Sequence, residues 1–105
     1  MIKIKNGVDI SYPVGDSFKL TVGRDIAFNT GDTLRLQIVR TEGTTPVIES
    51  TYNLNSSGEF DVVLQDSEKI KLQLGEHYKY RLTVIDINGN IDTEKSGNLA
   101  VEWGV

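Results

Sequence analysis

The chain has 105 residues, 38% of them hydrophobic, so we expect a single domain with its own core over residues 1–105. The absence of cysteine excludes disulfides, thiolate zinc sites and cysteine nucleophiles, and one histidine excludes any site with two histidine ligands. A net charge of −4 argues against binding of nucleic acid through clustered lysine and arginine.

Five segments alternate apolar and polar residues with a period of two, which is typical of strands with one face in a core. In chain order their apolar residues are Phe18, Leu20 and Val22; Leu34, Leu36 and Ile38; Phe60, Val62 and Leu64; Tyr78, Tyr80, Leu82 and Val84; and Leu99, Val101 and Trp103. Residues that favour turns separate these segments. About seven short strands with turns every 8–12 residues or so predict an all-β sandwich or small barrel.

The segment from Asp66 to Gly75 fits two structures. Ile70 and Leu74 have helical spacing, whereas Ile70, Leu72 and Leu74 also alternate as in a strand. We expect one short helical turn near 66–73, with Asp66 or Ser67 as its N-cap, followed by an extended approach to the next strand.

The strongest turn signal is Asn88-Gly89, because both residues tolerate positive φ. It predicts a two-residue type I′ hairpin that joins a strand over 78–87 to a strand over 90–94.

The motifs that resemble functional sites are better interpreted as turns. Gly15-Asp16-Ser17 and Gly31-Asp32-Thr33 lack the lysine of a phosphate-binding loop. Residues 86–92 resemble a calcium loop, but the glycine is at the fourth position instead of the sixth, and Lys95 replaces the bidentate glutamate. We therefore expect no catalytic residue, cofactor or metal site, and we interpret the chain as a protein without enzymatic activity.

The chain contains no apolar run of the roughly 7–15 residues that a secretion signal needs, nor the roughly 18–20 that a membrane span needs. We therefore expect synthesis in the cytoplasm and no membrane contact.

Six residues are candidates for contacts with a partner. Val39, Val63 and Ile85 interrupt the polar side of their strands, and together they would form an exposed apolar patch. Tyr12, Tyr52 and Trp103 are the aromatic candidates. Trp103 either closes the sandwich or packs on a neighbouring chain, since tryptophan is enriched at interfaces.

Leu72 lies six residues before Tyr78 in the run Leu74-Gly75-Glu76-His77-Tyr78-Lys79-Tyr80. This segment resembles the tyrosine corner of fibronectin type III and immunoglobulin-like domains. The resemblance implies an immunoglobulin-like antiparallel β-sandwich.

A narrower resemblance covers roughly residues 28–103 and is carried by the segments 31–38, 74–80, 86–93 and 97–101. These segments are similar to the N-terminal domain of baseplate upper proteins from tailed phages and prophages of Gram-positive bacteria. The resemblance implies a domain of a virion tail or baseplate that binds other tail proteins, with a homotrimer among its assemblies and no catalytic residues. The protein would then move from the cytoplasm into the virion.

Two functions follow as hypotheses. The leading one is a structural domain for protein–protein assembly, in which free edge strands could pair with a partner. The alternative is a carbohydrate- or cell-surface-binding module, which would need Tyr12, Tyr52 and Trp103 together on one exposed face.

Overall fold

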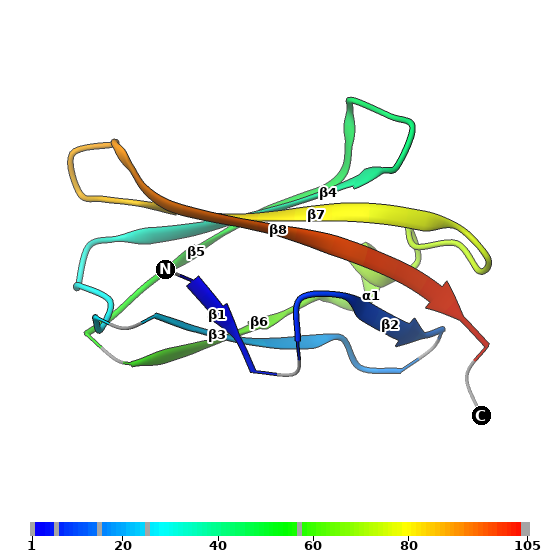
Figure 1. Cartoon of the computed structure of the whole chain (residues 1–105), viewed down its shortest axis with the longest axis horizontal. Coiled ribbons are helices and arrows are strands. Elements are labelled where there is room, and N and C mark those ends of the chain that lie inside the picture. Colours follow the sequence, from blue (N-terminus) through cyan, green and yellow to red (C-terminus); the bar gives the residue numbers. More distant parts are fainter. Residues whose placement is uncertain (1, 6, 15, 25, 57, 104–105) are drawn as a thin grey trace.

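The computed structural model describes residues 2–5, 7–14, 16–24, 26–56 and 58–103, which form two β-sheets that face each other (Figure 1). The smaller sheet has the order β1-β3-β6, formed by Ile2–Ile4 (β1), Lys19–Arg24 (β3) and Glu59–Val63 (β6). The larger sheet has the order β2-β8-β7-β4-β5, formed by Ile10–Pro13 (β2), Ile91–Glu102 (β8), His77–Ile85 (β7), Thr33–Arg40 (β4) and Pro46–Asn53 (β5). Neighbouring strands are antiparallel except β2 and β8, which are parallel. The expectation of an all-β fold is confirmed.

The core lies between the two sheets and contains residues from both. Every apolar residue of the five alternating segments is buried except Phe60 and Trp103. Phe60 lies in β6 at the edge of the smaller sheet, where its ring packs against Tyr52 with centroids 5.7 Å apart. Trp103 lies beyond the end of β8 and is 78% exposed. The alternation therefore predicted the inward face of all five segments.

The described residues form eight strands, where the sequence pattern predicted about seven. The alternating segments do not include β1, β2 and β5, which are edge strands with few inward residues. Conversely, β8 is one strand where two were expected, at 90–94 and near 99–103. Its polar middle stays in the sheet because it pairs with β7 throughout, with Lys95 opposite Leu82 and Asn98 opposite Lys79.

The hairpin between β7 and β8 differs from the predicted type I′ turn. Ile85 pairs with Ile91, and Gly89 has a φ of +86° whereas Asn88 does not have a positive φ. The Asp86 carboxylate accepts hydrogen bonds from the backbone N–H groups of Asn88 and Asn90, both at 2.9 Å. This side chain favours a three-residue turn with a single left-handed glycine, a connection that needs no positive φ at Asn88.

The predicted helical turn is present as α1, Asp66–Lys69, and its N-cap is Gln65, not Asp66 or Ser67. The Gln65 backbone N–H donates to the Glu68 carboxylate at 3.0 Å, which satisfies one of the groups that a helix start leaves unpaired. Among the described residues, no helix is long and apolar enough to span a membrane.

The connection between α1 and β7 is held by a tyrosine. The Tyr78 hydroxyl accepts a hydrogen bond from the Gln73 backbone N–H at 2.9 Å, and Tyr78 is 1% exposed. Beyond Gln73, Gly75 takes a φ of +82° and donates its N–H to the Val101 carbonyl at 3.0 Å. These bonds place the loop at residues 73–76 beside the end of β8.

Candidate functional site

The structure places Tyr12 in the core, so this residue is not the exposed anchor that the sequence suggested. It is 4% exposed, its ring lies edge-on to Phe18 at 5.4 Å, and its hydroxyl donates to the Asp16 carbonyl at 2.6 Å. The reason is its position in β2, where it pairs with the inward residue Val101 of β8. Gly15, which precedes Asp16 in the turn expected there, lies outside the described residues.

Tyr52 is half-buried and connects the edges of the two sheets. It lies in β5, and its hydroxyl donates to the Val63 carbonyl of β6 at 3.3 Å. Burial is the main reason that its pKa is raised, and the nearby Glu68 contributes to this. Across the larger sheet, Tyr52 pairs with Leu34, Leu34 with Val84, and Val84 with Thr93. Tyr52 is therefore level with a point nine residues before the end of β8, far from Trp103. Tyr12, Tyr52 and Trp103 therefore do not form one exposed aromatic face.

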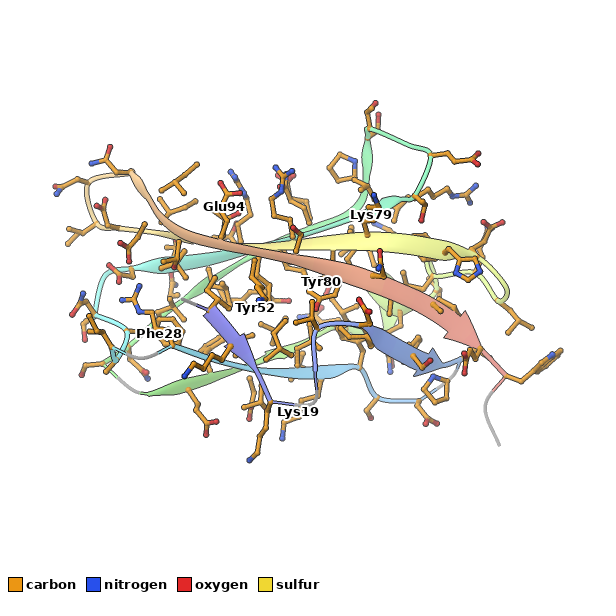
Figure 2. All side chains as sticks on the ribbon, viewed as in Figure 1. Lys19, Phe28, Tyr52, Lys79, Tyr80 and Glu94 are labelled. Atoms are coloured by element: carbon orange, nitrogen blue, oxygen red, sulfur yellow. The ribbon has the colours of Figure 1, made fainter. Side chains whose placement is uncertain are left out.

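Val39, Val63 and Ile85 do not form the single patch that the sequence suggested. Val39 pairs with Lys79, six residues from Ile85 along β7, which corresponds to roughly 20 Å. Val63 is 50% exposed but belongs to the other sheet. Figure 2 shows Lys79 and Glu94 projecting from the outer face of the larger sheet, whereas Tyr52 and Tyr80 lie between the sheets. The outer face is therefore largely covered by polar side chains.

Trp103 belongs to an apolar patch at the end of the sandwich where β8 stops. We call the set Val14, Ile70, Leu74 and Trp103 the Trp103 patch. Trp103, Ile70 and Leu74 are 78%, 80% and 38% exposed, respectively. Two backbone hydrogen bonds bring Val14 and Leu74 to the end of β8, because the Val14 N–H donates to the Glu102 carbonyl at 2.8 Å and the N–H of Gly75, next to Leu74, donates to the Val101 carbonyl at 3.0 Å. Part of the patch borders a groove of about 410 Å³, lined by Tyr12, Val14, Asp66, Lys69, Ile70 and Leu72.

A second set of exposed isoleucines lies toward the opposite end of the sheets, at Ile26, Ile87 and Ile91, which are 76%, 75% and 58% exposed. Ile87 lies over the Gly31 turn, where a Cβ atom on Gly31 would come within 3.0 Å of the Ile87 side chain. This end therefore also presents apolar side chains, on the loops that join β3 to β4 and β7 to β8 and at the start of β8.

A buried cation, which no sequence pattern indicated, joins the end of β3 to the following turn and to the start of β8. The Arg24 guanidinium pairs with Asp32 at 3.6 Å and with Asp92, and it lies 4.9 Å from the centre of the Phe28 ring. The side chains of Arg24 and Asp32 are both 6% exposed. Asp32 also forms the turn that its sequence predicted, with its N–H donating to the Asn29 carbonyl at 3.1 Å. No local pattern marks this cluster, because its members come from β3, a turn and β8.

Tyr80 and Gly97 hold the N-terminal segment as it passes from the smaller sheet to the larger one. The two residues are opposite each other in β7 and β8, and the Tyr80 hydroxyl donates to the Val8 carbonyl. A Cβ atom on Gly97 would lie 2.6 Å from the Tyr80 hydroxyl oxygen. Burial, together with the negative charge of Asp9, raises the pKa of Tyr80 to about 12. Tyr80 therefore stays protonated as a donor well into the alkaline range.

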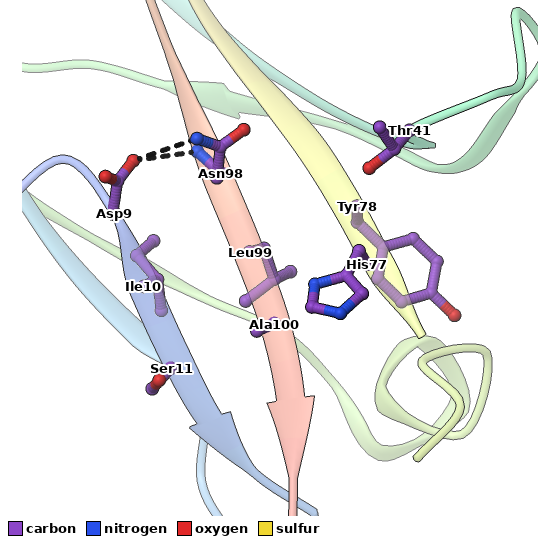
Figure 3. Close-up of a pocket in the computed structure, with 9 residues that line it drawn as sticks. All are labelled: Asp9, Ile10, Ser11, Thr41, His77, Tyr78, Asn98, Leu99 and Ala100. Atoms are coloured by element: carbon purple, nitrogen blue, oxygen red, sulfur yellow. Dashed lines mark hydrogen bonds between the residues drawn. The ribbon is translucent and has the colours of Figure 1, made fainter. Parts of the chain in front are cut away.

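The outer face of β2, β8 and β7 forms a shallow depression of about 430 Å³ around His77 (Figure 3). The Asp9 carboxylate accepts hydrogen bonds from the backbone and side-chain nitrogens of Asn98, both at 3.3 Å. Within the described part of the chain, no group of three or more His, Cys, Asp or Glu residues is arranged to hold a metal ion.

Comparison of the sequence with protein-family models and with curated proteins finds no match. Of the surfaces described above, the Trp103 patch combines the largest exposed aromatic side chain among the described residues with a groove that Val14 and Ile70 line.

Proposed function

We propose that the chain is a non-enzymatic structural domain of a phage or prophage tail or baseplate, where it acts by binding other tail proteins. The observation that carries the binding role is the exposure of Trp103, with the exposed Ile70 and Leu74 at the same end of the sandwich. Contiguous apolar patches on a protein surface mark sites of interaction, and tryptophan is enriched among residues that dominate binding energy.

The tail assignment rests on the resemblance over residues 28–103, and the strand order of the two sheets supports the immunoglobulin-like fold that this resemblance implies. If β1, β3, β4, β6, β7 and β8 are named A, B, C, E, F and G, the sheets have the orders A-B-E and G-F-C. These strands are distributed between the two sheets as in immunoglobulin-type sandwiches. The hydrogen bond between Tyr78 and the Gln73 backbone also corresponds to a tyrosine corner.

The alternative of a carbohydrate-binding module has less support. It requires Tyr12, Tyr52 and Trp103 on one face, whereas Tyr12 is buried and Tyr52 packs against Phe60. We therefore favour protein partners over sugars.

The test is quantitative mass spectrometry of tail particles released by the strain that encodes the chain and purified on a density gradient. We expect the chain to sediment with the tail proteins in a fixed ratio to them. A chain found only in the unassembled fraction would contradict the proposal. Trp103→Ala should reduce incorporation, while the matched change Thr44→Ala, at an exposed loop residue far from the patch in sequence, should not.

A further inference from the structure

We propose that a groove on the outer face of the larger sheet, beside the loop that joins β4 to β5, binds an extended acidic segment of a partner protein. The groove has a volume of about 480 Å³, and its lining includes Val39, Thr44, Pro46, Lys79, Arg81 and Ser96. We call it the Lys79 groove. It shares no residue with the Trp103 patch, and the proposal rests on the function proposed above only in taking a protein as the partner.

The shape of the Lys79 groove follows from an irregularity in the sheet. The pairing of β4 with β5 shifts register between Ile38 and Val39, and such a bulge bends the strands and increases their twist. The loop at 41–45 rises from the outer face and forms one wall (Figure 1). The floor includes β7, where Lys79 and Arg81 lie on either side of an inward residue and so project outward, as Figure 2 shows for Lys79.

The lining carries the positive charges of Lys79 and Arg81 and, among the described residues, no carboxylate. The Lys79 side chain is exposed and has no hydrogen-bond or ion-pair partner in the described part of the chain. Arg81 meets Glu94 only through its Nε atom, at 3.9 Å, and these side chains are 59% and 43% exposed. A pair this exposed contributes little, so the terminal nitrogens of Arg81 are open to a ligand. The hydroxyl groups of Thr44 and Ser96 add donors to the same lining.

The other acidic side chains around the Lys79 groove do not neutralise it. Glu49 lies on β5, two strands away from β7, and accepts a hydrogen bond from the Gln37 side chain at 2.8 Å. Glu42, in the loop between β4 and β5, lines a separate depression with Arg40 and His77. A carboxylate from a partner would therefore meet positive charges that the chain itself leaves largely unpaired, and this complementarity favours an acidic ligand.

The spacing of the two cations favours an extended segment. Lys79 and Arg81 are two residues apart on one face of β7, which corresponds to about 7 Å. Alternate residues of any extended chain have the same spacing, so a segment with an acidic residue at every second position would place one carboxylate at each cation when it lies along β7. The arginine fork can bind its carboxylate through two parallel hydrogen bonds. Val39 and Pro46 offer apolar contact to the hydrocarbon parts of the same segment.

A single-stranded nucleic acid fits the Lys79 groove less well, although its phosphates are also anionic. Proteins that bind such strands stack the bases on aromatic side chains. Tyr80 is the one aromatic residue among the described residues of the lining, and it is 1% exposed, with its ring between the sheets (Figure 2). The groove therefore lacks a surface for stacking.

The experiment is an NMR titration of the whole ¹⁵N-labelled chain with a short synthetic peptide in which glutamate alternates with threonine. We expect amide shifts centred on residues 79–81, with a dissociation constant on the order of 100 µM at low salt. Binding should weaken severalfold as salt rises from about 20 to about 150 mM, and the same peptide with glutamine in place of glutamate should not bind.

Matched variants locate the site. The double change Lys79→Gln and Arg81→Gln should weaken binding of the acidic peptide by about tenfold or more, since it removes both charged contacts. The control is the double change Lys5→Gln and Lys71→Gln, which removes the same charge from exposed residues outside the groove and should weaken binding less than about twofold. The amide spectrum of each variant shows whether it is folded.

The proposal is overturned if the acidic peptide does not bind, if the glutamine peptide binds equally well, or if the two double variants lose the same affinity. Tighter binding of a thymidine oligonucleotide than of the acidic peptide would also overturn it. The outcome is separate from the tail assignment. A chain that sediments with tail particles but does not bind the peptide would contradict only the Lys79 groove, whereas a chain that binds the peptide but is absent from the particles would contradict only the tail role.

Discussion

Replacing Gly97 by alanine should be one of the most destabilising small substitutions in this protein. The added Cβ atom would lie 2.6 Å from the Tyr80 hydroxyl oxygen and 2.7 Å from the ring carbon that bears it, and it would also contact the Val8 carbonyl. Tyr80 is 1% exposed in a packed core, so its ring cannot move away without displacing its neighbours. The hydrogen bond from Tyr80 to Val8 would be lost as well.

The size of the effect follows from three contributions. Leaving the partly buried Val8 carbonyl without its donor costs about 1–3 kcal/mol. Forcing the Tyr80 ring from its packed position costs about 1–3 kcal/mol. Replacing a strand glycine offsets this by about 0.5–1 kcal/mol, because alanine loses less backbone freedom on folding. The net loss is about 3 kcal/mol, a large share of the roughly 5–15 kcal/mol typical of a domain.

The assay is urea unfolding followed by circular dichroism, with Gly58→Ala as the matched control. A Cβ atom added to Gly58 would meet no other group within 4 Å, so this replacement should change the free energy of unfolding by less than about 0.5 kcal/mol. Tyr80→Phe should cost about 1–3 kcal/mol, and it should cost less when Gly97→Ala is already present, because both changes remove the same hydrogen bond. A Gly97→Ala protein as stable as the Gly58→Ala control would show that Tyr80 and Val8 do not exclude a Cβ atom at this position.

Three further predictions concern pH, the buried cation and the hairpin. The pKa of Tyr80 is raised to about 12 from the ordinary tyrosine value of 10.0, so its contribution to stability is complete below pH 10 and should be lost as pH rises to about 12. Absorbance at alkaline pH should follow this titration, and Tyr80→Phe should unfold with a weaker dependence on pH in that interval. Arg24→Met should cost about 3–5 kcal/mol because it leaves Asp32 buried and unpaired, whereas Arg81→Met, which removes an exposed pair with Glu94, should cost about 0–1 kcal/mol in the same denaturation assay. Asp86→Ala should speed hydrogen exchange at the amides of Asn88 and Asn90, and unchanged exchange would show that the carboxylate does not hold the turn.

Elements with a strong local pattern were predictable from the sequence. The alternation in β3, β4, β7 and the end of β8 follows directly from the need to bury one face of each strand, and the structure confirms it. The helical turn α1 was also predicted, although its N-cap shifted to Gln65 because the Glu68 carboxylate binds the Gln65 backbone N–H. In each of these cases, the residues that decide the structure are close together in the sequence.

Features decided by distant residues were missed. Tyr12 is a contact candidate from the sequence because β2 has only four residues, too few to show alternation, whereas its burial depends on pairing with β8. The Arg24 cluster and the contact between Tyr80 and Val8 join residues that are far apart in the sequence. At the site, the sequence leaves two roles open for Trp103, which are closing the sandwich and packing on a neighbouring chain. The choice between them depends on how the other elements close the core.

The most direct test of the central claim, that this chain acts through protein contacts at the Trp103 patch, is photo-crosslinking inside purified tail particles. A chain with benzoylphenylalanine in place of Trp103 would be assembled and irradiated, with the same replacement at Lys19 as the control, since Lys19 is exposed on the smaller sheet. The account predicts that position 103 crosslinks to a second copy or to a tail protein, while position 19 gives little product. Crosslinks at position 19 but none at position 103 would contradict it.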